Sequence, residues 1–194
     1  PVMMPDNVLS SQTVRGNIVG ARALAVTPIV DYEDGGVALN DSTRGNQYQI
    51  WQALLIKDQV LISAPNTPEF VMFAGPGLTE ISLTFDQNMR PVLAFMQSGV
   101  ARYRWYDPTV GAQIVTDLPA GSITPKVILD DKRQTQTSNC DVILAYVRAG
   151  GLYYRQQRDR YQIERLLTDG VTTSLLRIGF SDQLRLQFMM EVAR

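Results

Sequence analysis

The chain has 194 residues, of which 45% are hydrophobic and 19% are charged, and its formal net charge is -1. It has no histidine and a single cysteine, Cys140, so it cannot build an intrachain disulfide, a thiolate metal cage or a catalytic triad that uses histidine. A charge this close to zero gives no general attraction for nucleic acid or an anionic membrane. We therefore expect no cofactor, no nucleic-acid partner and no catalysis that depends on histidine.

The beginning of the chain predicts an extended arm rather than part of a core. Residues 1–20 are polar and irregular, and they lack the basic region and apolar stretch of a signal peptide. No segment approaches the ~20 apolar residues that a membrane-spanning helix needs, so we expect no membrane insertion. The first β-rich run is 22–30, and turn clusters follow at 31–36 and 41–45. The first of these resembles the opening of a calcium loop, but Gly35 and Ser42 stand where ligands are required, which favours a plain turn.

Short apolar runs between turn residues predict β-strands along the rest of the chain. A unit of three strands is found at 81–85, 92–96 and 100–106, and it returns at 127–129, 142–146 and 152–158. Both copies contain an Ala-aromatic step, Ala94-Phe95 and Ala145-Tyr146, and the two alanines are 51 residues apart. A third copy covers 175–180 and 183–188, with Phe188 in the place of Phe95. Strands at 49–56, 59–63 and 70–73 precede these copies, and Ala53-Leu54 is interpreted as a decayed copy of the step.

Repeats of this length predict an all-β fold of repeated antiparallel meander sheets, propeller-like as first choice and a β-sandwich as second. We expect one all-β domain over residues 21–194; a further boundary could fall near residue 75, and the best internal seam is 118–122. Residues 159–167 have both a helical and an alternating pattern. Because they follow a tyrosine-rich strand, a strand is the favoured prediction.

Two pairs of adjacent carboxylates, Glu33-Asp34 and Asp130-Asp131, do not indicate a glycosidase. Adjacent residues of a strand point to opposite faces, whereas glycoside hydrolysis needs two carboxyl groups across one sugar.

Arginine and aromatic residues alternate in two of the predicted strands. Arg102, Arg104 and Tyr106 share one face, opposite Tyr103 and Trp105. In the second copy, Leu152, Tyr154 and Gln156 lie opposite Tyr153, Arg155 and Gln157. Such strands can form a packed sheet face with paired arginines, a protein interface, or a groove for nucleic acid or glycan.

Fifteen arginines against three lysines favour a protein interface, although codon or lineage bias would give the same ratio. The candidate interface residues are Arg102, Arg104, Tyr106, Tyr154, Arg155, Arg158 and Arg160.

Several segments together resemble virion proteins of tailed bacteriophages: 27–38, 83–95, 105–107, 140–148, 152–160, 164–167 and 184–188. The resemblance implies a non-enzymatic structural subunit of the tail, at the nozzle, tip or fibre-attachment region. It also implies a homo-oligomer in a symmetric ring, with nozzle, adaptor or fibre proteins as partners, assembled in the host bacterial cytoplasm and located in the virion. The alternative is a glycan-binding module that contacts the host cell surface through Trp105, Tyr106 and Tyr153; a propeller-based glycan hydrolase is a third reading.

Overall fold

The structure is a computed structural model that describes residues 32–39, 48–64, 67–86, 88, 90–130, 141–170, 172–180 and 186–193. The expected arm at 1–20, the run at 22–30 and the turn cluster at 41–45 lie outside these ranges. Within them the chain is all-β, as predicted, and the helical part is a single 3-10 turn, η2 (Gln157–Asp159).

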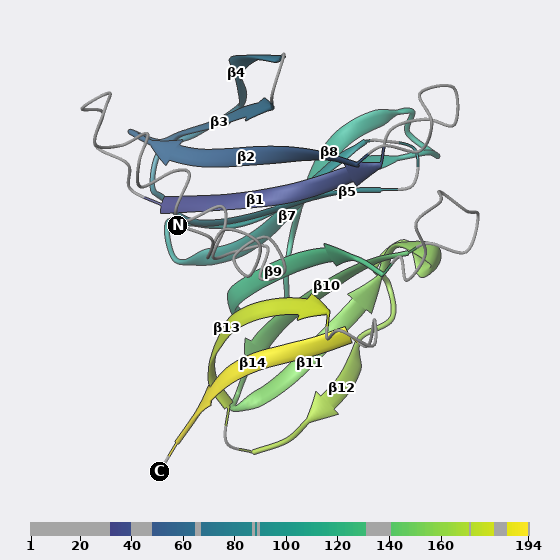
Figure 1. Cartoon of the computed structure of the whole chain (residues 1–194). Coiled ribbons are helices and arrows are strands. Elements are labelled where there is room, and N and C mark those ends of the chain that lie inside the picture. Colours follow the sequence, from purple (N-terminus) through teal and green to yellow (C-terminus); the bar gives the residue numbers. More distant parts are fainter. Residues whose placement is uncertain are drawn as a thin grey trace, which may run out of the picture.

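The strands form three sheets of four strands and one sheet of two strands (Figure 1). The first sheet contains β1 (Tyr32–Leu39), β2 (Tyr48–Ile56), β3 (Gln59–Ala64) and β4 (Thr67–Ala74), and the second contains β5 (Leu78–Phe85), β6 (Pro91–Gln97), β7 (Val100–Asp107) and β8 (Ala112–Asp117). The third contains β9 (Ile123–Leu129), β10 (Val142–Arg148), β11 (Gly151–Gln156) and β12 (Arg165–Thr168), and the fourth contains β13 (Thr172–Phe180) and β14 (Leu186–Val192).

Each sheet is an antiparallel meander in which strands that follow one another in the chain are neighbours. The sequence predicted a repeat of three strands, but the second and third sheets have four strands each. The additional strands are β8 and β12. Neither strand has the apolar run by which the others were found: β8 is half exposed, and Leu166 and Leu167 of β12 are exposed. An outer strand with little buried surface has a weak sequence signal.

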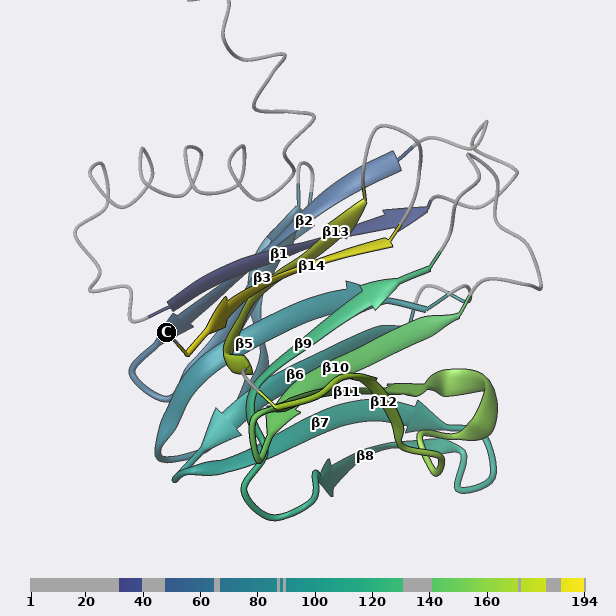
Figure 2. The same ribbon diagram turned by 90° about the horizontal axis from the view of Figure 1, so that it is seen from below.

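The sheets are stacked in chain order (Figure 1). β5 lies against β1, β9 against β5, and β13 against β9, so the first strands of successive sheets are adjacent. Figure 2 shows that the second and third sheets extend in the same direction, from β5 and β9 to β8 and β12. The described residues form an open stack of antiparallel meander sheets, and no closed propeller is formed among them.

Three apolar clusters fill the spaces between neighbouring sheets. The middle strands are covered on both faces, which explains their nearly continuous apolar runs. In β6, Leu93 and Phe95 pack toward the first sheet, whereas Val92, Ala94 and Met96 pack toward the third.

The Ala-aromatic step has the same role in the second and third sheets, and the first and fourth sheets each keep one half of it. Ala53, Ala94 and Ala145 are fully buried and face the next sheet in the stack. The aromatic residue that follows Ala94 or Ala145 faces the preceding sheet, as Phe188 also does. The equivalence that the sequence predicted for these segments is therefore confirmed.

Two local predictions were wrong. The turn expected at 31–36 is the beginning of β1, where Gly35 and Gly36 pair with Gln52 and Trp51 of β2. β1 is an edge strand, in which glycine is tolerated. At 159–167, the strand begins only at Arg165, since Arg160 and Tyr161 have positive φ angles of 56° and 58° that interrupt the chain direction.

The two predicted boundaries are both connections from one sheet to the next. Residues 75–77 join β4 to β5, and the seam at 118–122 joins β8 to β9. Apolar clusters continue across both connections, so each sheet shares its core with its neighbours.

Candidate functional site

The arginine-rich face of β7 looks toward the first sheet. Burial alternates along this strand: Tyr103 and Trp105 are buried toward the third sheet, and Arg102, Arg104 and Tyr106 are partly exposed on the other face. The alternation that the sequence predicted is confirmed, and the three candidate interface residues of this strand do share one face.

Two of these three side chains have partners within the chain. Arg102 Nε donates to Asp117 Oδ1 at 2.7 Å, and its Nη1 donates to the side chain of Gln97 at 2.7 Å. The guanidinium of Arg90 lies over the ring of Tyr106, 3.8 Å from its centroid. Arg102 and Tyr106 are thus already held in place.

Arg155 of β11 points inward, between the second and third sheets. It donates to the Tyr146 hydroxyl and to the Tyr161 carbonyl, each at 2.9 Å, and its ion pair with Glu164 measures 3.6 Å. Burial raises the pKa of Tyr146 to about 12, although the charge of Arg155 opposes this shift. Tyr154, on the opposite face, packs against the cluster between the third and fourth sheets. Arg155 stabilises the core and is poorly placed for a partner protein.

Arg158 and Arg160 belong to a network at one end of the sheets. Arg158 Nε donates to Asp141 at 2.6 Å, and Arg160 Nη2 donates to Asp107 at 2.7 Å. Burial alone would raise the pKa of Asp107, but hydrogen bonds from Thr109 and Arg160 outweigh it and lower the pKa. Because Asp107 ends β7 in the second sheet, the pair with Arg160 joins the second sheet to the third.

Tyr161 is a central residue that the sequence did not single out. Its side chain is fully buried between the second and third sheets, with its ring centroid 5.0 Å from that of Tyr103 and 5.1 Å from that of Trp105, in edge contacts. Its hydroxyl is buried without a hydrogen-bond partner among the described residues, and burial raises its pKa well above the ordinary value. A tyrosine within a polar loop gives no periodic signal of such burial.

Trp105 is 3% exposed and belongs to the same core as Tyr161. Tyr153 packs against that core and lies under the Arg148 guanidinium, 4.9 Å from it. Of the three residues proposed for a glycan-binding module, Tyr106 is covered by Arg90 and Trp105 has no surface on which a sugar could stack.

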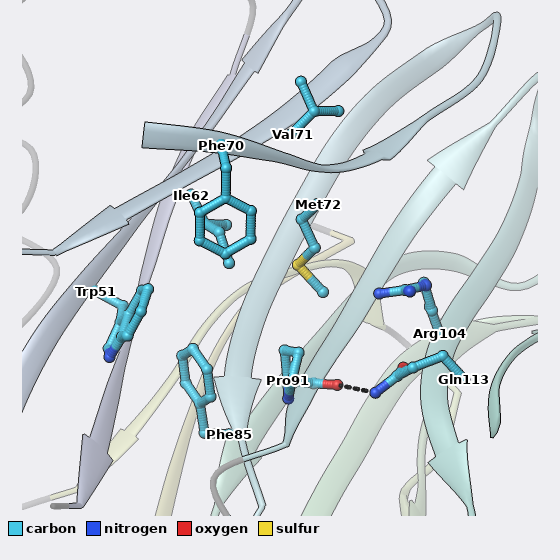
Figure 3. A pocket seen from close by; sticks show the side chains of 9 residues that line it. All are labelled: Trp51, Ile62, Phe70, Val71, Met72, Phe85, Pro91, Arg104 and Gln113. Atoms are coloured by element: carbon cyan, nitrogen blue, oxygen red, sulfur yellow. Dashed lines mark hydrogen bonds between the residues drawn. The ribbon is translucent and has the colours of Figure 1, made fainter. Parts of the chain in front are cut away.

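A pocket of about 540 Å³ opens between the first and second sheets (Figure 3). Its walls are mostly apolar, and Arg104 and Gln113 are its polar residues. The lining residues are Trp51, Ile62, Phe70, Val71, Met72, Phe85, Pro91, Arg104 and Gln113.

Arg104 differs from the other arginines of β7 and β11. Its guanidinium is directed toward Met72 and Pro91 in Figure 3, and none of the described residues gives it a hydrogen bond or an ion pair. Burial lowers its pKa from the ordinary value. Gln113 Nε2 donates weakly to the Pro91 carbonyl at 3.5 Å, and its buried Oε1 has no hydrogen-bond partner in the described ranges. The pocket therefore combines apolar walls with a cation to which the described part of the chain supplies no counter-ion.

No group of three or more acidic, histidine or cysteine side chains that could hold a metal ion occurs in the described part of the chain. In the same ranges, no helix has the length and hydropathy required to span a bilayer. Comparison with protein-family models, with curated proteins and with solved structures gives no match.

Proposed function

We propose that the chain is a non-enzymatic structural subunit of a bacteriophage tail, in the nozzle, tip or fibre-attachment region, which holds neighbouring tail proteins through static interfaces. The sequence resembles virion proteins, and one feature of the fold supports the same role. At one end of the stack, the fourth sheet contains two described strands where the other sheets contain four.

Among the described residues the fourth sheet has two strands, and its outer face carries both apolar and charged side chains. Leu176 and Met189 are 43% and 55% exposed, beside the exposed Arg177, Gln187 and Glu191, and β14 pairs with no described strand on its far side. Exposed strand edges and apolar patches are where proteins add a strand or dock a partner. In the repeat, a further sheet would lie against this face, so a neighbouring subunit in a ring is a suitable partner.

The first test is biochemical. Purified virions of the source phage should contain the chain in stoichiometric amount, measured by quantitative mass spectrometry of the tail fraction. Virions that lack the chain would refute the proposal.

The second test addresses the fourth sheet. Met189→Asp places a charge on its exposed face, and Val110→Asp is a matched control in the turn after β7, where the side chain is 62% exposed. Both variants should fold, because both sites are exposed, but only Met189→Asp should fail to enter virions in a complementation assay. Equal incorporation of the two variants would contradict a role for this face.

A further inference from the structure

Arg104 and Arg155 occupy the same position in consecutive sheets. Arg104 pairs in register with Leu93 of β6, and Arg155 pairs with Leu144 of β10. Each leucine directly precedes the Ala-aromatic step of its strand. Both arginines face the preceding sheet, so the spaces in front of them can be compared directly.

In front of Arg155, the chain itself fills the space. Tyr161 places its ring against the second sheet, and its carbonyl accepts a hydrogen bond from Arg155. Glu164, three residues later, supplies the carboxylate that faces Arg155 at 3.6 Å. An aromatic ring and an acid from one short segment thus occupy this position.

In front of Arg104, the equivalent space is the pocket. Phe95 stands where Tyr146 gives Arg155 a hydroxyl partner, and the neutral Gln113 lies in the wall. A partly desolvated guanidinium without a carboxylate is destabilising, and a carboxylate brought to it would form a charge-assisted hydrogen bond. Phe70 and Val71 on the rim, 47% and 49% exposed, extend the apolar surface beyond the cavity.

We infer that this pocket binds a segment of a partner protein that carries an aromatic side chain and, three residues later, a carboxylate. The aromatic ring would lie against the apolar walls and the carboxylate would pair with Arg104. This inference rests on the proposed function, since the partner is a neighbouring subunit, and it names the chemistry by which that subunit is recognised.

The two tryptophans of the chain provide the assay. Trp51 lines the pocket, whereas Trp105 is buried between the second and third sheets. In the full chain labelled with 5-fluorotryptophan, they should give two ¹⁹F NMR signals, which Trp51→Phe assigns. The probe is the peptide acetyl-Tyr-Gln-Ile-Glu-amide, which copies residues 161–164. At millimolar concentration it should shift the Trp51 signal in a saturable way and leave the Trp105 signal unchanged.

Two matched controls identify the carboxylate contact. A peptide with glutamine as its last residue should bind roughly tenfold more weakly, because the charge-assisted bond is lost. Arg104→Gln should weaken binding of the original peptide by a similar factor. Arg102→Gln, on the same face but already paired with Asp117, should leave it unchanged.

An unmoved Trp51 signal would overturn the inference, and so would equal binding of the two peptides or equal effects of the two arginine variants. Binding of free 2-naphthoate without binding of the peptide would also overturn it, in favour of a small organic anion. If virions contain the chain, these outcomes overturn the inference and leave the proposed function standing. If virions lack the chain but the peptide still binds, the proposed function fails and the binding site stands.

Discussion

Replacing Tyr161 separates the contribution of its ring from that of its hydroxyl. Tyr161→Ala removes a fully buried ring that contacts Tyr103 and Trp105, and Tyr161→Phe removes only a hydroxyl to which no described residue is hydrogen-bonded. Both variants keep the carbonyl that Arg155 uses, and both keep a side chain at the positive φ angle. The backbone contribution is therefore the same in the two.

The two variants should differ in how they change the free energy of unfolding. Truncation of a buried aromatic ring costs about 3–5 kcal/mol in the free energy of unfolding, so Tyr161→Ala should be strongly destabilised. For a chain of this size the melting temperature should fall by about 6–20 °C, since 1 kcal/mol corresponds to ~2–4 °C. A buried hydroxyl without a partner costs about 1–3 kcal/mol to desolvate, so Tyr161→Phe should be as stable as the natural chain or more stable.

Urea unfolding followed by tryptophan fluorescence measures both variants, because Trp105 contacts the ring. If Tyr161→Phe loses as much stability as Tyr161→Ala, the hydroxyl has an essential partner and the reasoning fails. If neither variant is destabilised, the ring does not fill the space between the second and third sheets.

Two further predictions concern pH and a turn glycine. Burial raises the pKa of Tyr146 from 10.0 to about 12, so the stability that its neutral hydroxyl contributes is complete below pH 10 and is lost as the pH rises toward 12. The free energy of unfolding should therefore fall between pH 10 and pH 12. A constant free energy over this interval would contradict the burial of Tyr146. Gly77→Ala should destabilise the chain by about 1–3 kcal/mol more than Gly99→Ala. Both glycines have positive φ angles, but only at Gly77 would the new Cβ lie close to another residue, 2.4 Å from Ser98 Oγ and 3.2 Å from the Ser98 backbone nitrogen. Chemical denaturation of the two variants checks this, and equal losses would show that Ser98 moves aside.

Periodicity identified the parts of the fold that are buried on both faces. The runs that became β6 and β10 are almost entirely apolar, and their Ala-aromatic steps marked equivalent positions, because every residue there contacts a neighbouring sheet. The outer strand β8 escaped detection and the start of β12 was placed six residues too early, since a strand covered on one side needs few apolar residues. β1 escaped because its glycines and acids are typical of turns.

The candidate site was predictable as a set of side chains but not as a set of contacts. Alternation placed Arg102 and Arg104 on one face of β7. It could not distinguish them, because their difference depends on Asp117, which pairs with Arg102 from the next strand. The partners of Arg155 likewise come from β10 and from the loop before β12. Long-range pairing of this kind depends on register and loop conformation, which local patterns do not record.

Loop length explains why one space is filled and the other is open. In the third sheet, the connection from β11 to β12 spans residues 157–164, which is long enough to turn back and insert Tyr161. In the second sheet, the connection from β7 to β8 spans only residues 108–111, and Asp107 closes it by accepting hydrogen bonds from the backbone of Thr109 and Gly111, each at 2.8 Å. A turn this short and tightly bonded cannot supply an aromatic ring and an acid to Arg104. A ligand for Arg104 with that chemistry must therefore come from outside this turn, and our proposal assigns it to a partner.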